Sequence, residues 1–559
     1  MRWWPLAAAA ALVVLLAATN AIPTWPGLIH LVALPPLDQF TDLRLLLSRA
    51  SSWPVFLTLL AGVTAARVVF MAWLLGGLDT RRLRFAALFY TIASGPVLLA
   101  AMADASAYAV LYSRLFWPAV ALIGVLVLTL GPVPWQGGSK LSEAVALTWR
   151  RGLRLEVMLP YCAVILALGA VADRLPVLTV PLVPVSAVAT GLTIRAMDRP
   201  SLRRPGAALA ALTAVLTAAS VAFVATPGYT EPEPGPPQPG SLLILSGINS
   251  ASGRGRIYAT DVHRLGYRCE QVYYFSYAGP GDGQPQGDAT CPIRTGTPYG
   301  PDDTQRPFHE QVDLFAEQAT ALPRPLVVAA HSHAVWVVWE AVATGRVDVD
   351  TLLLVGAFPS TPTGYPPPHV DEPGRVLGDL LRVAAPAADL VRFHFDPDSP
   401  AARELLGTKG AAESILAQPL PQSVRALSLP AATDLPLIAD GRRLDVERNG
   451  CPARVAHPNL PTSAAFEDAT IRFLNGRPPP PCPPWRDWGA VAVRPFGVPS
   501  GQARRQRRGS PTRGTAEGAC WRRDTCVARK MRFGSLGRLP GKRRCAATLR
   551  LSAPVSTIR

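Results

Sequence analysis

Two patterns of apolar residues divide the chain near residue 226. Residues 1–226 contain repeated apolar runs, each long enough to cross the roughly 30 Å of hydrocarbon in a bilayer. Two interpretations of the first run stay open: an uncleaved anchor, which we favour, and a signal peptide ending in small residues near Ala21. The runs predict a helical multi-pass membrane bundle with spans near 5–21, 53–77, 85–103, 115–132, 155–172, 175–194 and 206–226.

A different pattern follows the proline-rich segment 227–240, which predicts a stiff, extended linker. Residues 241–476 alternate short strand-like apolar runs with segments of helical spacing, which is typical of a mostly parallel sheet with helices on both faces. The expected strands are 242–245, 271–275, 326–330, 350–355 and 424–429. The expected helices are 258–265, 309–322, the segment after residue 332, and 464–474.

Composition agrees with this division. The 559 residues are 49% hydrophobic and only 17% charged, whereas a typical soluble protein carries about 25% charged residues. The formal net charge is +16, and residues 500–559 carry +14 of it, from sixteen Arg or Lys and two acids. For the Pro-rich and then Arg-rich tail, 477–559, we expect disorder and assign no function.

The remaining basic residues predict an orientation. Loops 78–84, 133–154 and 195–205 hold eleven Lys or Arg, and the alternate loops hold four. Because basic loops stay in the cytoplasm, we expect the protein to cross the cell membrane with its N-terminus in the cytoplasm. The 241–476 domain would then be extracytoplasmic. Arg67 lies inside the second predicted span; it is either a functional residue or, as we favour, one that pairs within the bundle or reaches the interface.

Four cysteines fall in or beside the second domain. An even number of cysteines outside the cell suggests disulfides, although free buried thiols remain an alternative. The nearest pairs in sequence are Cys269 with Cys291 and Cys451 with Cys482.

A candidate nucleophile lies in the segment LVVAAHSHAVWVVWE, residues 326–340. A buried strand ends, Ser332 follows, and a helix begins at once, as in a nucleophile elbow of pattern G-x-S-x-G. Here Ala330 and Ala334 replace the two glycines, which weakens the motif. The alternative is that Ser332 only caps the helix.

Two later residues could complete a catalytic triad. Asp434 and His457 follow Ser332 in the order Ser, acid, His. Histidine would take the serine proton, and the acid would hold the imidazole tautomer. Four other acids compete with Asp434: Asp396, Asp398, Asp440 and Asp445.

The loop after the first strand of the domain, SGINSASG at 246–253, could supply part of an oxyanion hole. Its backbone N–H donor would be Ile248 or Asn249, and the second donor would be the N–H of His333. We expect no metal, because the histidines show no paired ligand spacing, and no cofactor, because the acyl-enzyme reaction needs none.

Residues 241–476 resemble the α/β-hydrolase superfamily of serine esterases, lipases and thioesterases. The resemblance implies that Ser332 is the nucleophile, Asp434 the acid and His457 the base. The blocks FSYAG at 275–279 and PYGPDDT at 298–304 also resemble exported or membrane-attached members from high-GC bacteria. In this superfamily an insertion such as 359–423 often forms a lid; a solvated connector is the alternative.

The leading hypothesis is a membrane-anchored extracytoplasmic serine hydrolase. It would cleave an ester or thioester, a lipid ester among the candidates, through an acyl-enzyme; its partners would be the bilayer and this substrate, not nucleic acid. Two alternatives are a non-catalytic binding or scaffold domain with a hydrolase fold, and a transporter with an outer regulatory domain.

Overall fold

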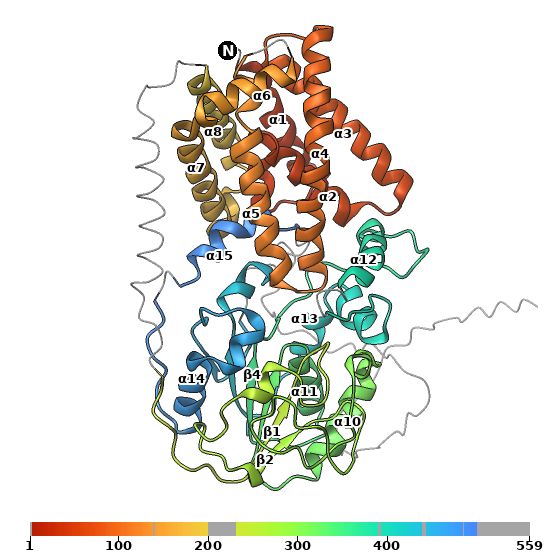
Figure 1. The fold of residues 1–559 in the computed structure, drawn as a ribbon, viewed down its shortest axis with the longest axis vertical. Helices are drawn as coiled ribbons and strands as arrows, with labels where there is room; N and C mark the ends of the chain where they lie inside the picture. The colour runs from red at the N-terminus through yellow and green to blue at the C-terminus, as the bar shows by residue number, and fades with distance from the viewer. Residues whose placement is uncertain are drawn as a thin grey trace, which may run out of the picture. The chain divides into compact units, whose positions relative to one another are not determined.

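The computed structural model describes residues 3–137, 140–198, 231–388, 393–438, 443–483 and 486–499 (Figure 1). These residues all belong to one compact unit, Met1–Arg504. The predicted span 206–226, residues 227–230 of the linker and the chain from residue 500 onward lie outside the described residues.

The N-terminal part is helical. Four helical segments are long and apolar enough to cross a membrane: Trp53–Leu74, Thr80–Ala109, Ser113–Trp135 and Gly152–Arg174. The apolar helices α1 and α8 are shorter. The described helices of this part are α1 (Trp4–Ala18), α2 (Leu37–Arg49), α3 (Trp53–Leu74), α4 (Thr80–Ala109), α5 (Ser113–Leu130), α6 (Leu141–Arg150), α7 (Leu155–Arg174) and α8 (Leu182–Met197).

Six of these helices coincide with predicted spans, whereas α2 and α6 were not predicted. Both helices are shorter than a membrane span. In addition, α2 contains polar residues, so its sequence is not a continuous apolar run. Some of those polar residues pair with Arg67 on α3. Its Nε lies 2.7 Å from Asp42 Oδ2, and its Nη1 donates to the carbonyl of Leu31 at 2.7 Å. Pairing within the helical part therefore accounts for Arg67.

The second part contains a six-stranded parallel sheet with strand order β2-β1-β3-β4-β5-β6. The strands are β1 (Ser241–Leu245), β2 (Val272–Tyr274), β3 (Leu326–His331), β4 (Thr351–Val355), β5 (Arg425–Leu429) and β6 (Arg448–Asn449). The helices are α10 (Phe308–Thr320), α11 (Ala334–Ala343), α12 (Arg375–Ala388), α13 (Ala411–Leu416), α14 (Ala464–Leu474) and α15 (Trp488–Val493).

Helices cover both faces of this sheet (Figure 1). Side chains alternate along each strand, so Leu243 and Val328 pack in one apolar cluster with residues of α10 and α11. Ile244 and Val327 point the other way and pack with Phe466 and other residues of α14. Double-sided burial explains why the strands appear in the sequence as continuous apolar runs. The predicted α/β architecture is confirmed.

Two local expectations are wrong. Residues 258–265 do not form a helix; a single 3-10 turn, Arg256–Ala259, is present. Asp261 Oδ1 accepts hydrogen bonds from the backbone N–H groups of His263 and Arg264, a local turn that competes with a helix. In the predicted disordered tail, residues 486–499 are ordered, and α15 packs against α7.

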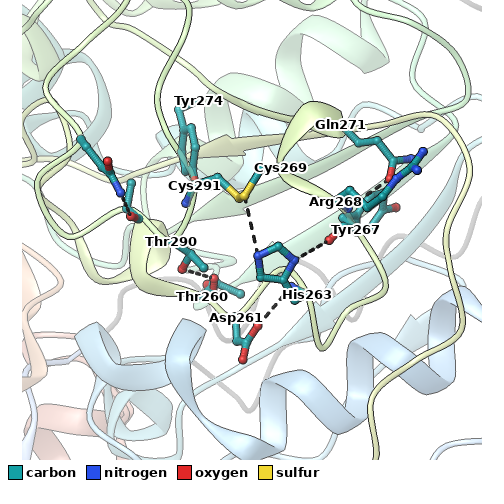
Figure 2. Close-up of a disulfide and its surroundings, with 12 residues drawn as sticks. Thr260, Asp261, His263, Tyr267, Arg268, Cys269, Gln271, Tyr274, Thr290 and Cys291 are labelled. Carbon is teal, nitrogen blue, oxygen red and sulfur yellow. Dashed lines mark hydrogen bonds between the residues drawn. A yellow bond between two sulfur atoms is a disulfide. The ribbon is translucent and has the colours of Figure 1, made fainter.

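The expected disulfides are present, and they join the pairs nearest in sequence, Cys269–Cys291 and Cys451–Cys482. Figure 2 shows the first, with the imidazole of His263 beside Cys269; Nε2 lies 3.7 Å from Sγ. The nitrogen of His263 and the two sulfurs lie within 4.8 Å of one another. Cysteine binds a metal ion as a thiolate, and both of these sulfurs are bonded in the disulfide. Only His263 could then supply a ligand, so this group does not fit a metal.

Candidate active site

Ser332 occupies a strained turn between β3 and α11. Its φ is +61°, a conformation that non-glycine residues rarely adopt. Its N–H donates to the carbonyl of Val355 at 2.9 Å, which fixes the turn against the end of β4. His333, not Ser332, is the N-cap residue of α11, and no side chain caps that helix. The interpretation of Ser332 as a simple helix cap is therefore wrong.

Small residues surround this turn. Ala330 and Ala334, in place of the expected glycines, are completely buried. Gly247 approaches most closely: a Cβ added there would lie 2.8 Å from Ser332 Cβ and 3.0 Å from the carbonyl oxygen of His331. Gly247, in the loop after β1, is therefore a position beside the serine turn where a side chain would not fit.

The sheet topology places this turn where ligands bind in open α/β sheets. β1 and β3 are neighbours, while β2 lies on the far side of β1, so the connections from β1 and from β3 leave in opposite directions. The carboxyl ends of such strands border a crevice at the topological switch point. Ser332 follows β3, and the loop 246–253 follows β1.

The predicted acid and base are in direct contact. His457 Nδ1 lies 2.5 Å from Asp434 Oδ2. The side chain of Asp434 is only 2% exposed and that of His457 is 12% exposed. The segment after β5 carries Asp434 in a 3-10 turn, Ala432–Leu437, and a second such turn, His457–Thr462, begins with the histidine. A short bond between a carboxylate and Nδ1 is the contact that orients a catalytic imidazole.

The competing acids are engaged elsewhere or exposed. Asp398 pairs with Arg382, and Asp396 Oδ1 accepts the N–H of Asp398. Asp445 is exposed, and Asp440 lies outside the described residues.

Ser332 and His457 are both close to Phe358, but no hydrogen bond joins the two side chains in the described structure. The ring of Phe358, which lines the same cavity as Ser332, stacks on the His457 ring with centroids 5.3 Å apart. The Gly356 backbone also approaches that ring, because a Cβ there would lie 2.8 Å from its Cε1. Serine–histidine bonds are often long in ligand-free enzymes and shorten when substrate binds.

The two histidines beside Ser332 are buried. His331 Nε2 lies 3.2 Å from the carbonyl of His457, behind the turn. Burial lowers the pKa of His331 well below its usual range, and the neighbouring imidazole of His457 lowers it further. Burial also lowers the pKa of His333 to about 3, and its Nε2 bonds Gln311 Oε1 at 2.9 Å. Both rings are neutral near pH 7 and hold the surrounding structure in place.

The three candidate oxyanion donors differ in their partners. The N–H of Asn249 donates to Thr304 Oγ1 at 3.0 Å. The N–H groups of Ile248 and His333 make no hydrogen bond to another described residue. The geometry favours Ile248 over Asn249.

A small apolar cavity, of about 40 Å³, opens at Ser332. Part of its wall comes from the 359–423 insertion, and part comes from the turn between α4 and α5. The lining residues are Val110, Leu111, Ile248, Ser332, His333, Trp336, Phe358, Ala401, Leu405 and Leu406. A larger cavity of about 550 Å³, lined by Arg49 and Lys409 among others, contains none of the predicted site residues.

One residue at the candidate site was not predicted from the sequence, and it bonds the second carboxylate oxygen of Asp434. Ser113, the first residue of α5, donates to Asp434 Oδ1 at 2.7 Å. This contact joins residues 321 positions apart, so no local motif points to it.

Comparisons with protein-family models, with curated proteins and with solved structures find no match for this chain. The fold and the site therefore define its class by geometry alone. It is a protein with membrane-like helices followed by a parallel-sheet α/β domain that has two disulfides.

Proposed function

We propose that this protein is a membrane-anchored serine hydrolase of the α/β-hydrolase type, which cleaves an ester or thioester through an acyl-enzyme. The observation that carries the proposal is the backbone of Ser332. A serine held at φ +61° between a strand and a helix, at the switch point of a parallel sheet, is a strained residue at a binding crevice.

The surrounding groups supply the remaining chemistry. His457 accepts the Ser332 proton as the oxygen attacks the substrate carbonyl, and then returns that proton to the leaving group. Asp434 holds Nδ1 and stabilises the imidazolium that forms. The N–H groups of Ile248 and His333 stabilise the oxyanion. Water then attacks the acyl-enzyme by the same route and regenerates Ser332.

The contacts between the two parts support an extracytoplasmic α/β domain. Three junctions that the charge pattern assigns to the outer side all contact that domain or its C-terminal extension. Trp53 donates to Asp379 on α12, Ser113 donates to Asp434, and Asp173 pairs with Arg494. The two disulfides fit an oxidising compartment as well.

Labelling with a fluorophosphonate probe tests the proposal. We expect the full-length protein in membranes to be labelled and Ser332→Ala to be unlabelled. Ser423→Ala is the matched control, because Ser423 is exposed and has no described bond, and it should label like the parent protein. Absence of labelling in the parent protein would exclude an activated serine.

A non-catalytic binding domain is the second candidate. The absence of a Ser332–His457 hydrogen bond among the described residues favours it, as do the alanines that flank the serine. Under this alternative the cavity at Ser332 binds an apolar ligand, and ligand affinity survives Ser332→Ala while no probe reacts with the parent protein.

A further inference from the structure

The loop that carries Asp434 is held by side chains of the helical N-terminal part. Tyr108, on α4, donates its hydroxyl to the carbonyl of Pro436 at 2.7 Å. Trp117, on α5, donates its indole N–H to the carbonyl of Thr433 at 3.0 Å. Ser113 donates to the carboxylate itself. Three donors from one helical hairpin therefore fix the acid and the residues on both sides of it.

The bond from Ser113 completes the coordination of a buried charge. Asp434 has two oxygens, and His457 uses Oδ2. Oδ1 accepts from Ser113 at 2.7 Å, with Thr433 Oγ1 farther away at 3.4 Å. Ser113 is itself only 3% exposed, so water cannot readily replace its hydroxyl. A buried carboxylate oxygen without a donor costs free energy, so the bond from Ser113 favours the orientation of the carboxylate in which Oδ2 faces His457.

The same hairpin also closes the cavity at the serine. Val110 and Leu111, in the turn between α4 and α5, line the same cavity as Ser332. Leu111 is buried and has a φ of +52°. Two residues that line the cavity, Leu111 and Ser332, therefore have strained backbone conformations. Strain of this kind persists only where the surrounding structure imposes it.

We infer that the α4–α5 hairpin is part of the active site, with Ser113 as the positioning residue for the acid and Leu111 as a wall of the acyl pocket. This inference rests on the proposed hydrolase function. It means that a fragment limited to 241–476 lacks one wall of its pocket and the second support of its acid.

Substitutions at Ser113 in the full-length protein test the inference. Ser113→Ala removes only the hydroxyl, and Ser113→Thr and Ser113→Val differ from each other only in whether the hydroxyl is present. We expect Ser113→Ala and Ser113→Val to lower kcat for p-nitrophenyl acetate by about 10- to 100-fold, with KM nearly unchanged, because a hydrogen bond to a charged group is lost. Ser113→Thr should restore most of the rate relative to Ser113→Val.

The outcomes separate the inference from the function on which it rests. If the parent protein neither reacts with fluorophosphonate nor hydrolyses the ester, the proposed function fails. If the parent protein is active and Ser332→Ala is not, but Ser113→Ala or Ser113→Val keeps the parent kcat, the function stands and the positioning role is overturned. A fall in thermal stability with unchanged kcat would likewise assign Ser113 a structural role only.

Discussion

Gly247→Ala should displace the nucleophile. The added Cβ would lie 2.8 Å from Ser332 Cβ, whereas ordinary contacts begin near 3.4 Å, so the two loops must separate by about 0.6 Å. A displacement of about 1 Å at a reacting atom can cost 100-fold in rate. We therefore expect the second-order rate constant for fluorophosphonate labelling to fall about 10- to 100-fold. Overpacking should also lower the free energy of unfolding by about 1–3 kcal/mol.

Gly300→Ala is the matched control for this experiment. Gly300 has a φ of −114°, which alanine adopts readily, and a Cβ there would meet no atom within 4 Å. It should label at the parent rate. Parent-like labelling of a folded Gly247→Ala variant would refute the argument, because it would show that the serine does not depend on the close approach of the β1 loop.

Three further predictions concern the acid, the pocket wall and a disulfide. Asp434→Asn should lower the labelling rate on the order of 10³-fold or more, because an amide favours the wrong tautomer of His457; a loss below 10-fold would contradict the assignment of the acid. Leu111→Ala should shift the preference among p-nitrophenyl esters from acetyl towards longer acyl chains, by roughly 10-fold per accommodated methylene, and an unchanged chain-length profile would place the acyl group elsewhere. Replacing Cys269 and Cys291 together by serine removes a disulfide that closes a loop of 22 residues. The free energy of unfolding in urea should fall by about 3 kcal/mol, and an unchanged urea midpoint would show that the disulfide does not stabilise the fold.

Much of this fold can be predicted from local sequence because strands buried on both faces consist of consecutive apolar residues. β3 and β4 are buried on both faces, so each is an apolar run that ends where the site begins. The strand β6 has two residues, Arg448 and Asn449, neither of them apolar, and left no such signal. The segment 258–265 has helical spacing, but a single side chain, Asp261, bonds the backbone and prevents the helix.

The candidate site divides in the same way. The serine turn and the order of acid and histidine are visible in the sequence because each lies just after an element. The sequence does not show why Ile248 is a better oxyanion-hole donor than Asn249, because the N–H of Asn249 is bonded to the hydroxyl of Thr304, 55 residues away. The contact of Ser113 with Asp434 depends on how two separately patterned halves of the chain meet.

Buried Arg44 on α2 links the assembly of the helical part to the time needed to make the rest of the chain. Its guanidinium is 1% exposed and donates to the carbonyl of Gly497 at 2.5 Å and to that of Pro495 at 3.4 Å. Its acidic neighbour, Asp104, lies farther away at 3.9 Å. At a synthesis rate of about 5–20 residues per second, the 453 residues between Arg44 and Gly497 take roughly 20–90 s. Throughout that interval the cation lacks these two carbonyls, and its remaining polar partners are Thr41 Oγ1 at 3.4 Å and the carboxylate of Asp104.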